Sequence, residues 1–270
     1  MSQQTQVLRV EIALPGFLAR FPSLRTLADA QLAEVTRAWT GLGYNRRAVG
    51  LWRAARSIVA ERDGELPRSL AELEELPGIG PYTARAIMAF AYGAAVTALD
   101  TNSRRVLGRL LCGGPRPDGS RGTNGTRKFQ ARADALAPAG DARAWNHALM
   151  DLGATVCRSR PRCDACPLAT LCEYRRSVGT ELPARRKRSV DAAAASHADA
   201  RRSELASRRR LRGRIVSTLR AAAVDAWVAV DPTAVDGAPS AVTEALATLE
   251  RDGLIERDAR SWVRLRTGIP

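Results

Sequence analysis

The fold is decided by residues 76–84, which read Leu-Pro-Gly-Ile-Gly-Pro-Tyr-Thr-Ala. Gly78 and Gly80 stand one residue apart, which lets the backbone turn tightly with its amide groups pointing outward. Pro81 suits the first turn of a helix, where the N–H that it lacks would have no partner anyway. Amides at the positive end of a helix make a phosphate site. A lone Gly-x-Gly would indicate a structural turn, but prolines and apolar helices on both sides favour a helix–hairpin–helix that grips a DNA backbone.

Helical patterns dominate both sides of this hairpin, as far as about residue 175. Apolar residues recur at the three- and four-residue spacing of a helix face, whereas the alternation typical of strands is almost absent. Ser69 and Glu72 have the spacing of a capping box, which predicts a short helix before the hairpin. Longer helices are expected over about 24–39, 48–59, 82–92 and 145–157, and one more from Asp100 onward. The sequence therefore predicts an all-α fold for this part.

Composition and charge limit the classes of protein to which the chain can belong. The 270 residues suffice for one large or two modest domains, and 45% hydrophobic residues indicate a globular chain. Lys and Arg number 42 against 28 Asp and Glu, and the net charge of +14 favours a polyanion, with nucleic acid as the first expectation. We find no apolar run near the roughly 20 residues that span a bilayer, and no opening signal-peptide pattern. We therefore expect a cytoplasmic, nucleoid-associated protein without membrane contacts.

Asp100 lies twenty residues beyond Gly80, where the next helix is expected to begin. A carboxylate at this place is stabilised in its ionised form by free amides and by the helix dipole. An isolated Asp in such a position is most often a simple N-cap. Its placement just after the hairpin raises the alternative that it is a functional carboxylate.

Four of the five cysteines lie within sixteen residues, which in a chain without a secretion signal indicates a metal site rather than disulfides. They are Cys157, Cys163, Cys166 and Cys172, with gaps of five, two and five residues, while Cys112 lies apart. Zinc ribbons usually pair two Cys-x-x-Cys knuckles, so a single knuckle favours a 4Fe–4S cluster. The first gap, residues 158–162, carries three arginines. We therefore expect a structural, DNA-facing cluster rather than an electron carrier.

The composition changes after residue 182. Residues 183–212 hold ten basic and three acidic residues among alanine and serine, which fits a solvated linker or an arm that contacts phosphates. Farther on, two helical patterns are followed by alternating segments at 254–257 and 261–265, which suggest a β-hairpin. We therefore predict a basic linker at 183–207 and a small C-terminal winged-helix-like domain at 208–270.

The order of hairpin, aspartate and four cysteines resembles that of the helix–hairpin–helix DNA glycosylases that carry an iron–sulfur cluster. Within that superfamily the chain resembles the MutY-type, A/G-specific adenine glycosylases. Three more segments carry the resemblance, Met1–Val7, Thr40–Tyr44 and Asn146–Gly153, which read MSQQTQV, TGLGY and NHALMDLG. The resemblance covers about residues 1–175 and implies a glycosylase region at 1–182, with a 4Fe–4S cluster in the loop at 157–172.

The resemblance also implies roles for single residues. Asp100 would be the catalytic aspartate that stabilises the sugar cation as adenine leaves. Gln4 and Thr5 would fill and read the space beside the partner base, typically 8-oxoguanine. Leu42 and Tyr44 would flank that base, with Tyr44 wedged into the stack.

Tyr82 occupies a position that separates subfamilies. A lysine there marks enzymes of the endonuclease III type, which form a Schiff base with the sugar and cut the strand. Tyrosine cannot form that adduct, so Tyr82 implies a monofunctional hydrolase. Gly78 and Gly80 would bind DNA as part of the hairpin.

The function implied is base-excision repair by a monomer on double-stranded DNA, through hydrolysis of the N-glycosidic bond of adenine mispaired with 8-oxoguanine or guanine. One alternative is a thymine or uracil glycosylase on the same scaffold, since some thymine glycosylases also carry tyrosine at the position of Tyr82. The Gln3-Gln4-Thr5 segment favours adenine. The second alternative is a catalytically impaired DNA-binding protein.

The chain departs from the family pattern at its start. The family's general-acid glutamate sits two residues before the Met that matches Met1, and Glu11 lies on the wrong side of the Gln-Gln-Thr motif to replace it. We therefore expect that the chain is truncated at its N-terminus. As given, it should bind mismatched DNA but release adenine slowly, because a general acid typically contributes about 100- to 10,000-fold.

Overall fold

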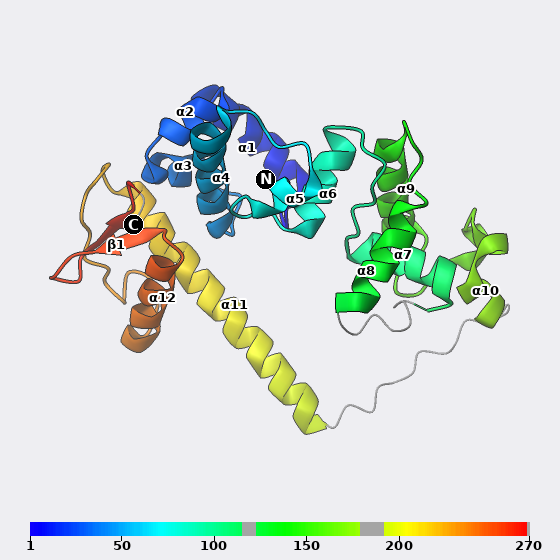
Figure 1. The fold of residues 1–270 in the computed structure, drawn as a ribbon. Coiled ribbons are helices and arrows are strands. Elements are labelled where there is room, and N and C mark those ends of the chain that lie inside the picture. The colour runs from blue at the N-terminus through cyan, green and yellow to red at the C-terminus, as the bar shows by residue number, and fades with distance from the viewer. Residues whose placement is uncertain (115–122, 179–191, 269–270) are drawn as a thin grey trace. The chain divides into compact units, whose positions relative to one another are not determined.

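The computed structural model describes residues 1–114, 123–178 and 192–268, which form two units with separate cores (Figure 1). The terminal unit joins Met1–Leu66 to Arg188–Pro270, and the central unit is Pro67–Lys187. The described residues are mostly helical, which confirms the all-α prediction. Among them no helix is both long and apolar enough to cross a membrane.

The central unit contains the hairpin and the cysteine loop. Its α-helices are α5 (Leu70–Glu75), α6 (Pro81–Phe90), α7 (Thr101–Cys112), α8 (Thr123–Asp134), α9 (Ala142–Thr155) and α10 (Glu173–Val178). Two short 3-10 turns, Cys163–Ala165 and Ala169–Leu171, shape the cysteine loop. The core buries Leu99, Val106, Leu107, Phe129, Ala133 and Leu149.

Local sequence explains where the central helices begin and end. Ser69 caps α5 by accepting a hydrogen bond from the amide of Glu72, as the predicted capping position requires. Its hydroxyl also donates to the Glu72 carboxylate. Helix α7 begins at the Asp100 cap and ends at Gly113, whose φ of 68° is strained for any residue with a side chain.

The terminal unit contains helices from both ends of the chain and one small sheet. Its elements are α1 (Val7–Arg20), α2 (Leu24–Asp29), α3 (Leu32–Ala38), α4 (Arg46–Arg62), α11 (Ala192–Ala221), α12 (Pro239–Arg251), β1 (Ile255–Arg257) and β2 (Val263–Leu265). The strands are antiparallel, with Glu256 opposite Arg264, and Val228 forms a bridge to Val263. Helices α11 and α12 and this hairpin follow one another in the predicted order, but they share a unit with Met1–Leu66, and the winged-helix-like domain stays a prediction.

One core joins the two ends of the chain in this unit. Leu211, Ile215 and Leu219 of α11 are at most 5% exposed and belong to the same cluster as Trp39 and Trp52. Two arginines reinforce the contact. Arg37 donates to the carbonyls of Ala222 and Ala223, and Arg220 donates to the carbonyl of Thr36 and the side chain of Asn45. Burial lowers the pKa of Arg220 to about 10, so it stays charged at neutral pH.

Two segments differ from the sequence expectation. The pattern over 24–39 forms two short helices, because the backbone is extended at Ala30 and a second capping box, Gln31 with Glu34, starts α3. Residues 192–207 of the predicted linker are helical and continuous with the helix expected around residue 211. Residues 183–191 lie outside the described part of the chain.

Candidate functional site

The hairpin has the geometry that its glycines and proline predict. Gly78 has a φ of 81°, so glycine is needed there, whereas Gly80 has a φ of −100° that any residue adopts. Gly80 is the N-cap of α6 and has no side chain to occupy the first amides of the helix, and Pro81 follows it as the first helical residue. A Cβ on Gly80 would meet no described atom within 4 Å. The absence of a side chain thus leaves the positive end of α6 open to an anion.

Asp100 and Tyr82 stand at the starts of two helices and interact electrostatically. Asp100 is the N-cap of α7, and its Oδ1 accepts a hydrogen bond of 2.6 Å from the amide of Ser103. Burial raises the pKa of Tyr82, and the negative charge of Asp100 raises it further. Tyr82 is therefore a neutral phenol at physiological pH beside a half-buried carboxylate.

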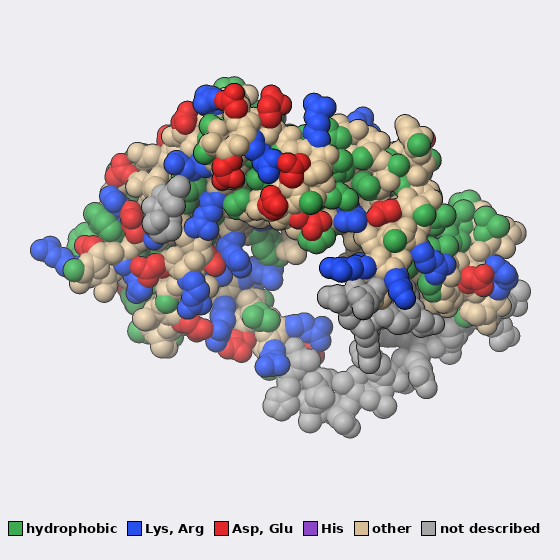
Figure 2. Space-filling view, viewed as in Figure 1, with side chains coloured by type: hydrophobic (Ala, Val, Ile, Leu, Met, Phe, Trp, Pro, Cys, Tyr) green, Lys and Arg blue, Asp and Glu red, His purple; other side chains and the backbone are tan. Residues whose placement is uncertain are grey.

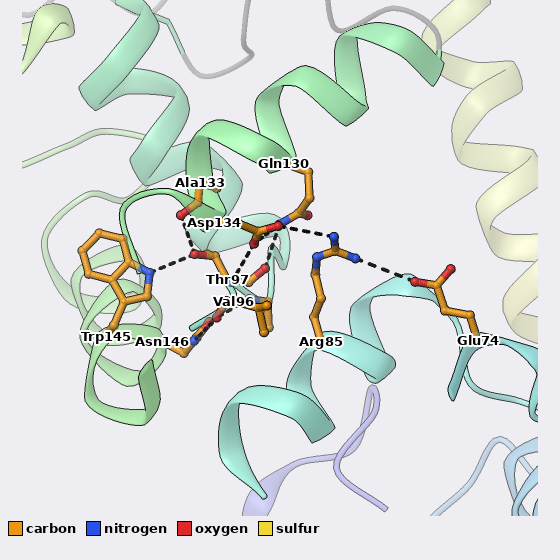
Figure 3. Close-up of polar contacts among 10 residues, drawn as sticks. Glu74, Arg85, Val96, Thr97, Gln130, Ala133, Asp134, Trp145 and Asn146 are labelled. Atoms are coloured by element: carbon orange, nitrogen blue, oxygen red, sulfur yellow. Dashed lines mark hydrogen bonds and ion pairs between the residues drawn. The ribbon is translucent and has the colours of Figure 1, made fainter. Parts of the chain in front are cut away.

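A buried amide fixes the segment that leads into Asp100 (Figure 3). Asn146 of α9 is only 1% exposed, and its Oδ1 accepts from the amide of Ala98 at 2.8 Å. Its Nδ2 donates to the carbonyl of Val96 at 2.9 Å and to that of Ala142 in its own helix at 2.8 Å. One side chain thereby holds residues 96–98 against α9 on both sides of Thr97.

Thr97 is held from the opposite side by α8. Its amide donates to Asp134 Oδ1 at 2.8 Å, and its hydroxyl donates to the carbonyl of Ala133 at 2.7 Å. The indole of Trp145 donates to the Thr97 hydroxyl, and Gln130 donates to the Thr97 carbonyl (Figure 3). The main-chain groups of Thr97 are thus satisfied although the residue is fully buried.

Arg85 connects this network to the hairpin helices. It extends from α6 and approaches Asp134 at 3.4 Å and Glu74 of α5 at 3.7 Å (Figure 3). The hairpin and the segment before Asp100 are therefore tied through one guanidinium. Sequence reasoning missed this network, and its only signal was Asn146 within the quoted NHALMDLG segment.

Gly153 permits a close approach of α9 to the start of α7. A Cβ at this position would lie 2.8 Å from the Cβ of Asn102, and the backbone there leaves no flexible atom to move. The short distance brings the last turns of α9 against the first turn after Asp100.

The residues expected beside the partner base gather in the terminal unit, around Arg47. Arg47 donates to the carbonyl of Met1 at 2.6 Å, to the Thr5 hydroxyl at 2.6 Å and to the carbonyl of Leu42 at 2.9 Å. The Thr5 hydroxyl also lies 3.0 Å from the carbonyl of Leu42, and its bonds join the Gln-Gln-Thr and Gly-Leu-Gly-Tyr loops. Burial lowers the pKa of Arg47, and Tyr44 opposes that shift. Sequence analysis did not single out Arg47, whose partners lie up to 46 residues away.

Of the residues predicted to contact the partner base, some have exposed side chains in these two loops and one has a buried side chain. Gln4 and Tyr44 have left-handed backbones, with φ of 53° and 47°, and both side chains are exposed. Such a conformation in non-glycine residues indicates a strained segment held by its surroundings. Leu42 is only 2% exposed and packs into the core, so its carbonyl rather than its side chain belongs to the network.

The four clustered cysteines surround one pocket. Cys157, Cys163, Cys166 and Cys172 line it together with Arg109 and Tyr174, whereas Cys112 does not. Arg109 is 5% exposed, and its guanidinium lies 3.4 Å from Cys157 Sγ. Burial raises the pKa of the Cys163 thiol. No three His, Cys, Asp or Glu side chains of the described residues have the arrangement of a single metal-ion site, while four thiols at one pocket provide the donor set of a thiolate-bound cluster.

Two of the three arginines of the cysteine loop bond to the protein. Arg158 donates to the carbonyl of Ala154, and Arg162 donates to that of Thr155, at the negative end of α9. Arg160 is exposed and makes no hydrogen bond or ion pair with the described residues. Bonds to neutral carbonyls leave the charges of Arg158 and Arg162 in place, so all three exposed arginines contribute to the basic surface of this loop.

Comparison with known proteins places this geometry in a family. The family model "HhH-GPD superfamily base excision DNA repair protein" matches residues 1–123. An adenine DNA glycosylase of Mycobacterium tuberculosis is 38% identical over 226 residues, covering 82% of this chain and 68% of the relative. That of Mycolicibacterium smegmatis is 46% identical over 65% of the chain, and that of Homo sapiens 40% over 67%. The chain spans 58% and 33% of the length of these last two relatives.

Solved structures show the same fold. A thermostable thymine-DNA glycosylase superposes with a TM-score of 0.58 at 26% identity, over 65% of this chain and 80% of that one. An endonuclease III in a non-covalent complex with DNA superposes with a TM-score of 0.54 at 24% identity, over the same shares. The latter supports the fold alone.

Proposed function

The chain belongs to the adenine DNA glycosylase family, and on this premise we propose that it hydrolyses the N-glycosidic bond of adenine mispaired with 8-oxoguanine or guanine in double-stranded DNA. The observation that carries the proposal is Asp100, a carboxylate fixed at the start of α7 by the Ser103 amide and backed by a buried polar network. An enzyme with this task works on chromosomal DNA, as a monomer associated with the nucleoid.

Asp100 supplies the electrostatic part of the reaction. The target base must leave the stack to reach a carboxylate held within the protein. As the C1′–N9 bond of the nucleotide breaks, its electron pair leaves with adenine and positive charge develops on the sugar, which the ionised Asp100 stabilises. Water then adds to C1′, and of its two protons one stays on the new hydroxyl while the other balances the charge of the departing adenine. Gly78 and Gly80, at the open start of α6, bind a backbone phosphate of the same strand.

The loops joined by Arg47 take the partner base. Gln4 and Tyr44 expose their side chains from left-handed turns, while Thr5 and Leu42 anchor these turns through Arg47. In this proposal Tyr44 enters the base stack and Gln4 contacts the base opposite adenine. The choice of adenine over thymine is supported by relatives at 38–46% identity, against 26% for the thymine-DNA glycosylase.

The decisive assay measures free adenine after single-turnover incubation with duplexes that differ in one pair. We expect release from adenine opposite 8-oxoguanine or guanine, and none from adenine opposite thymine. Release of thymine from a guanine mispair would favour the thymine alternative. Selective binding of the mispair without release of any base would favour a DNA-binding protein without catalysis.

Strand cleavage should be absent, because Tyr82 offers a phenol where a Schiff base needs an amine. We expect an intact abasic product and no covalent protein–DNA complex on borohydride reduction. Tyr82→Lys is the positive control, since it places an amine beside Asp100, and Tyr82→Phe should resemble the unsubstituted chain. Efficient trapping of the unsubstituted chain would contradict a monofunctional enzyme.

We further propose that Cys157, Cys163, Cys166 and Cys172 hold a 4Fe–4S cluster, which when bound would keep the cysteine loop in shape. The support is the pocket that all four thiols line. Purified protein should be brown with about four irons per chain. Cys166→Ser should lose the iron, whereas Cys112→Ser should retain it, because Cys112 does not line the pocket. Stoichiometric zinc without iron would contradict the cluster.

A further inference from the structure

Tyr44 is contacted by an arginine from the far end of the sequence. Arg209 of α11 donates from Nη1 to the Tyr44 hydroxyl at 3.0 Å, and its guanidinium carbon lies 5.1 Å from the centre of the ring. The guanidinium carbon of Arg47 lies 5.5 Å from the same centre. A ring that is 42% exposed on a strained backbone is thus fixed by two cations.

The position of Arg209 is fixed by the core of the terminal unit. Two residues farther along α11, Leu211 is 5% exposed, and Ile215 and Val216 are fully buried in the cluster shared with the first four helices. The carbonyl contacts made by Arg37 and Arg220 hold the end of α11 against α3. Helix α11 therefore cannot slide along Tyr44 without opening this core.

The neighbours of Arg209 on α11 have other partners. Arg208 pairs with Glu204 and Glu244, and Arg210 donates to the hydroxyl of Ser207. Figure 2 shows basic side chains along the surface of α11, all of them arginines. General attraction for DNA can come from many of these cations, but the contact with Tyr44 belongs to Arg209.

We propose that Arg209 is a positioning residue that sets specificity for the mispair, by holding the Tyr44 ring in the orientation in which it enters the base stack. This inference rests on the proposed function. Holding an exposed ring in place before binding lowers the entropy cost of ordering it in the complex. The resulting gain in affinity applies only to complexes in which the ring is inserted into the base stack. The C-terminal helix then contributes to the choice of DNA as well as to the fold.

The test compares Arg209→Ala with Arg210→Ala in the full chain. Both remove one arginine from adjacent positions of α11, but only the first removes the contact with Tyr44. Affinity is measured for a duplex with 2′-fluoroadenosine, which resists hydrolysis, opposite 8-oxoguanine, and for the same duplex with an adenine–thymine pair. Arg209→Ala should lower the ratio of the two affinities about two- to fivefold, while Arg210→Ala should weaken both equally. Equal ratios for the two variants would overturn the proposal.

Two further variants separate positioning from charge. Arg209→Lys keeps a cation and a donor, and it should restore most of the ratio. In a Tyr44→Ala background both the hydroxyl acceptor and the ring are gone, so the effect of Arg209→Ala should disappear. An unchanged effect in that background would mean that Arg209 acts on DNA directly, which also contradicts the proposal.

A measurement without DNA tells failure of this inference from failure of the proposed function. In protein with ¹³C-labelled tyrosine, Tyr44→Phe assigns the Tyr44 signal among the four tyrosines. Arg209→Ala should shift that signal and Arg210→Ala should not, and absence of the shift overturns the contact. If the shift occurs but the unsubstituted chain does not prefer the mispair, the proposed function fails and the specificity role fails with it, while the contact stands.

Discussion

Replacing Asp100 by asparagine is expected to lower the rate constant of adenine release by about 100- to 1000-fold. The reason is the loss of the negative charge that stabilises the developing sugar cation. Asparagine has the same shape and is as good an N-cap as aspartate, so the bond from the Ser103 amide should persist. The free energy of unfolding should change by no more than about 1 kcal/mol, the usual value of a charge at a helix start.

The measurement is single-turnover release of adenine from an adenine–8-oxoguanine duplex, followed over long incubations. Asp141→Asn is the matched control, because Asp141 is also the N-cap of a helix of the central unit, and its side chain makes no cap bond. The control should leave the rate constant nearly unchanged. An Asp100→Asn protein that releases adenine within a few-fold of the unsubstituted rate would contradict the role of Asp100.

Replacing Asn146 by leucine is expected to destabilise the central unit by about 2–6 kcal/mol. The change leaves the amide of Ala98 and the carbonyl of Val96 without their side-chain partner, and each unsatisfied buried group costs about 1–3 kcal/mol. Adenine release should fall as well, because residues 96–98 lead directly into Asp100.

Urea unfolding measures the loss of stability, and hydrogen exchange at the amide of Ala98 locates it. Gln130→Ala provides a milder comparison, because Gln130 is only partly buried and donates from outside to the Thr97 carbonyl and to Asp134. We expect a cost of about 1 kcal/mol for that variant. Equal effects of the two substitutions would mean that Asn146 does not fix this segment.

The sequence predicts features whose causes are local. The turn at Gly78, the first helical residue Pro81 and the cap at Asp100 each depend on residues within four positions, and the structure has them where expected. The overall all-α fold follows from the same short-range patterns. The family could be predicted because its motifs are also short segments of the chain. Comparison with known proteins confirms it.

What the sequence could not predict depends on partners far apart in the chain. Hydrogen-bond partners lie 42 residues from Arg47, 48 from Asn146 and 165 from Arg209. The sequence around an arginine or an asparagine does not indicate which distant residue it will contact. The alanine-rich residues 192–207 suggested a linker by composition, although alanine also has the highest helix propensity. They form the first half of α11, whose later residues, from Leu211 onward, pack against helices from the start of the chain.

The shared core of the terminal unit has a consequence for synthesis on the ribosome. Residues 1–66 emerge first, but the helix that completes their core begins after residue 187. At roughly 5–20 residues per second, the delay is on the order of ten seconds. The central unit, which is continuous in sequence, can fold completely in that interval. The N-terminal part of this core, which includes Val49, meanwhile lacks the packing that the C-terminal segment supplies, so its apolar side chains stay accessible to chaperones until that segment arrives.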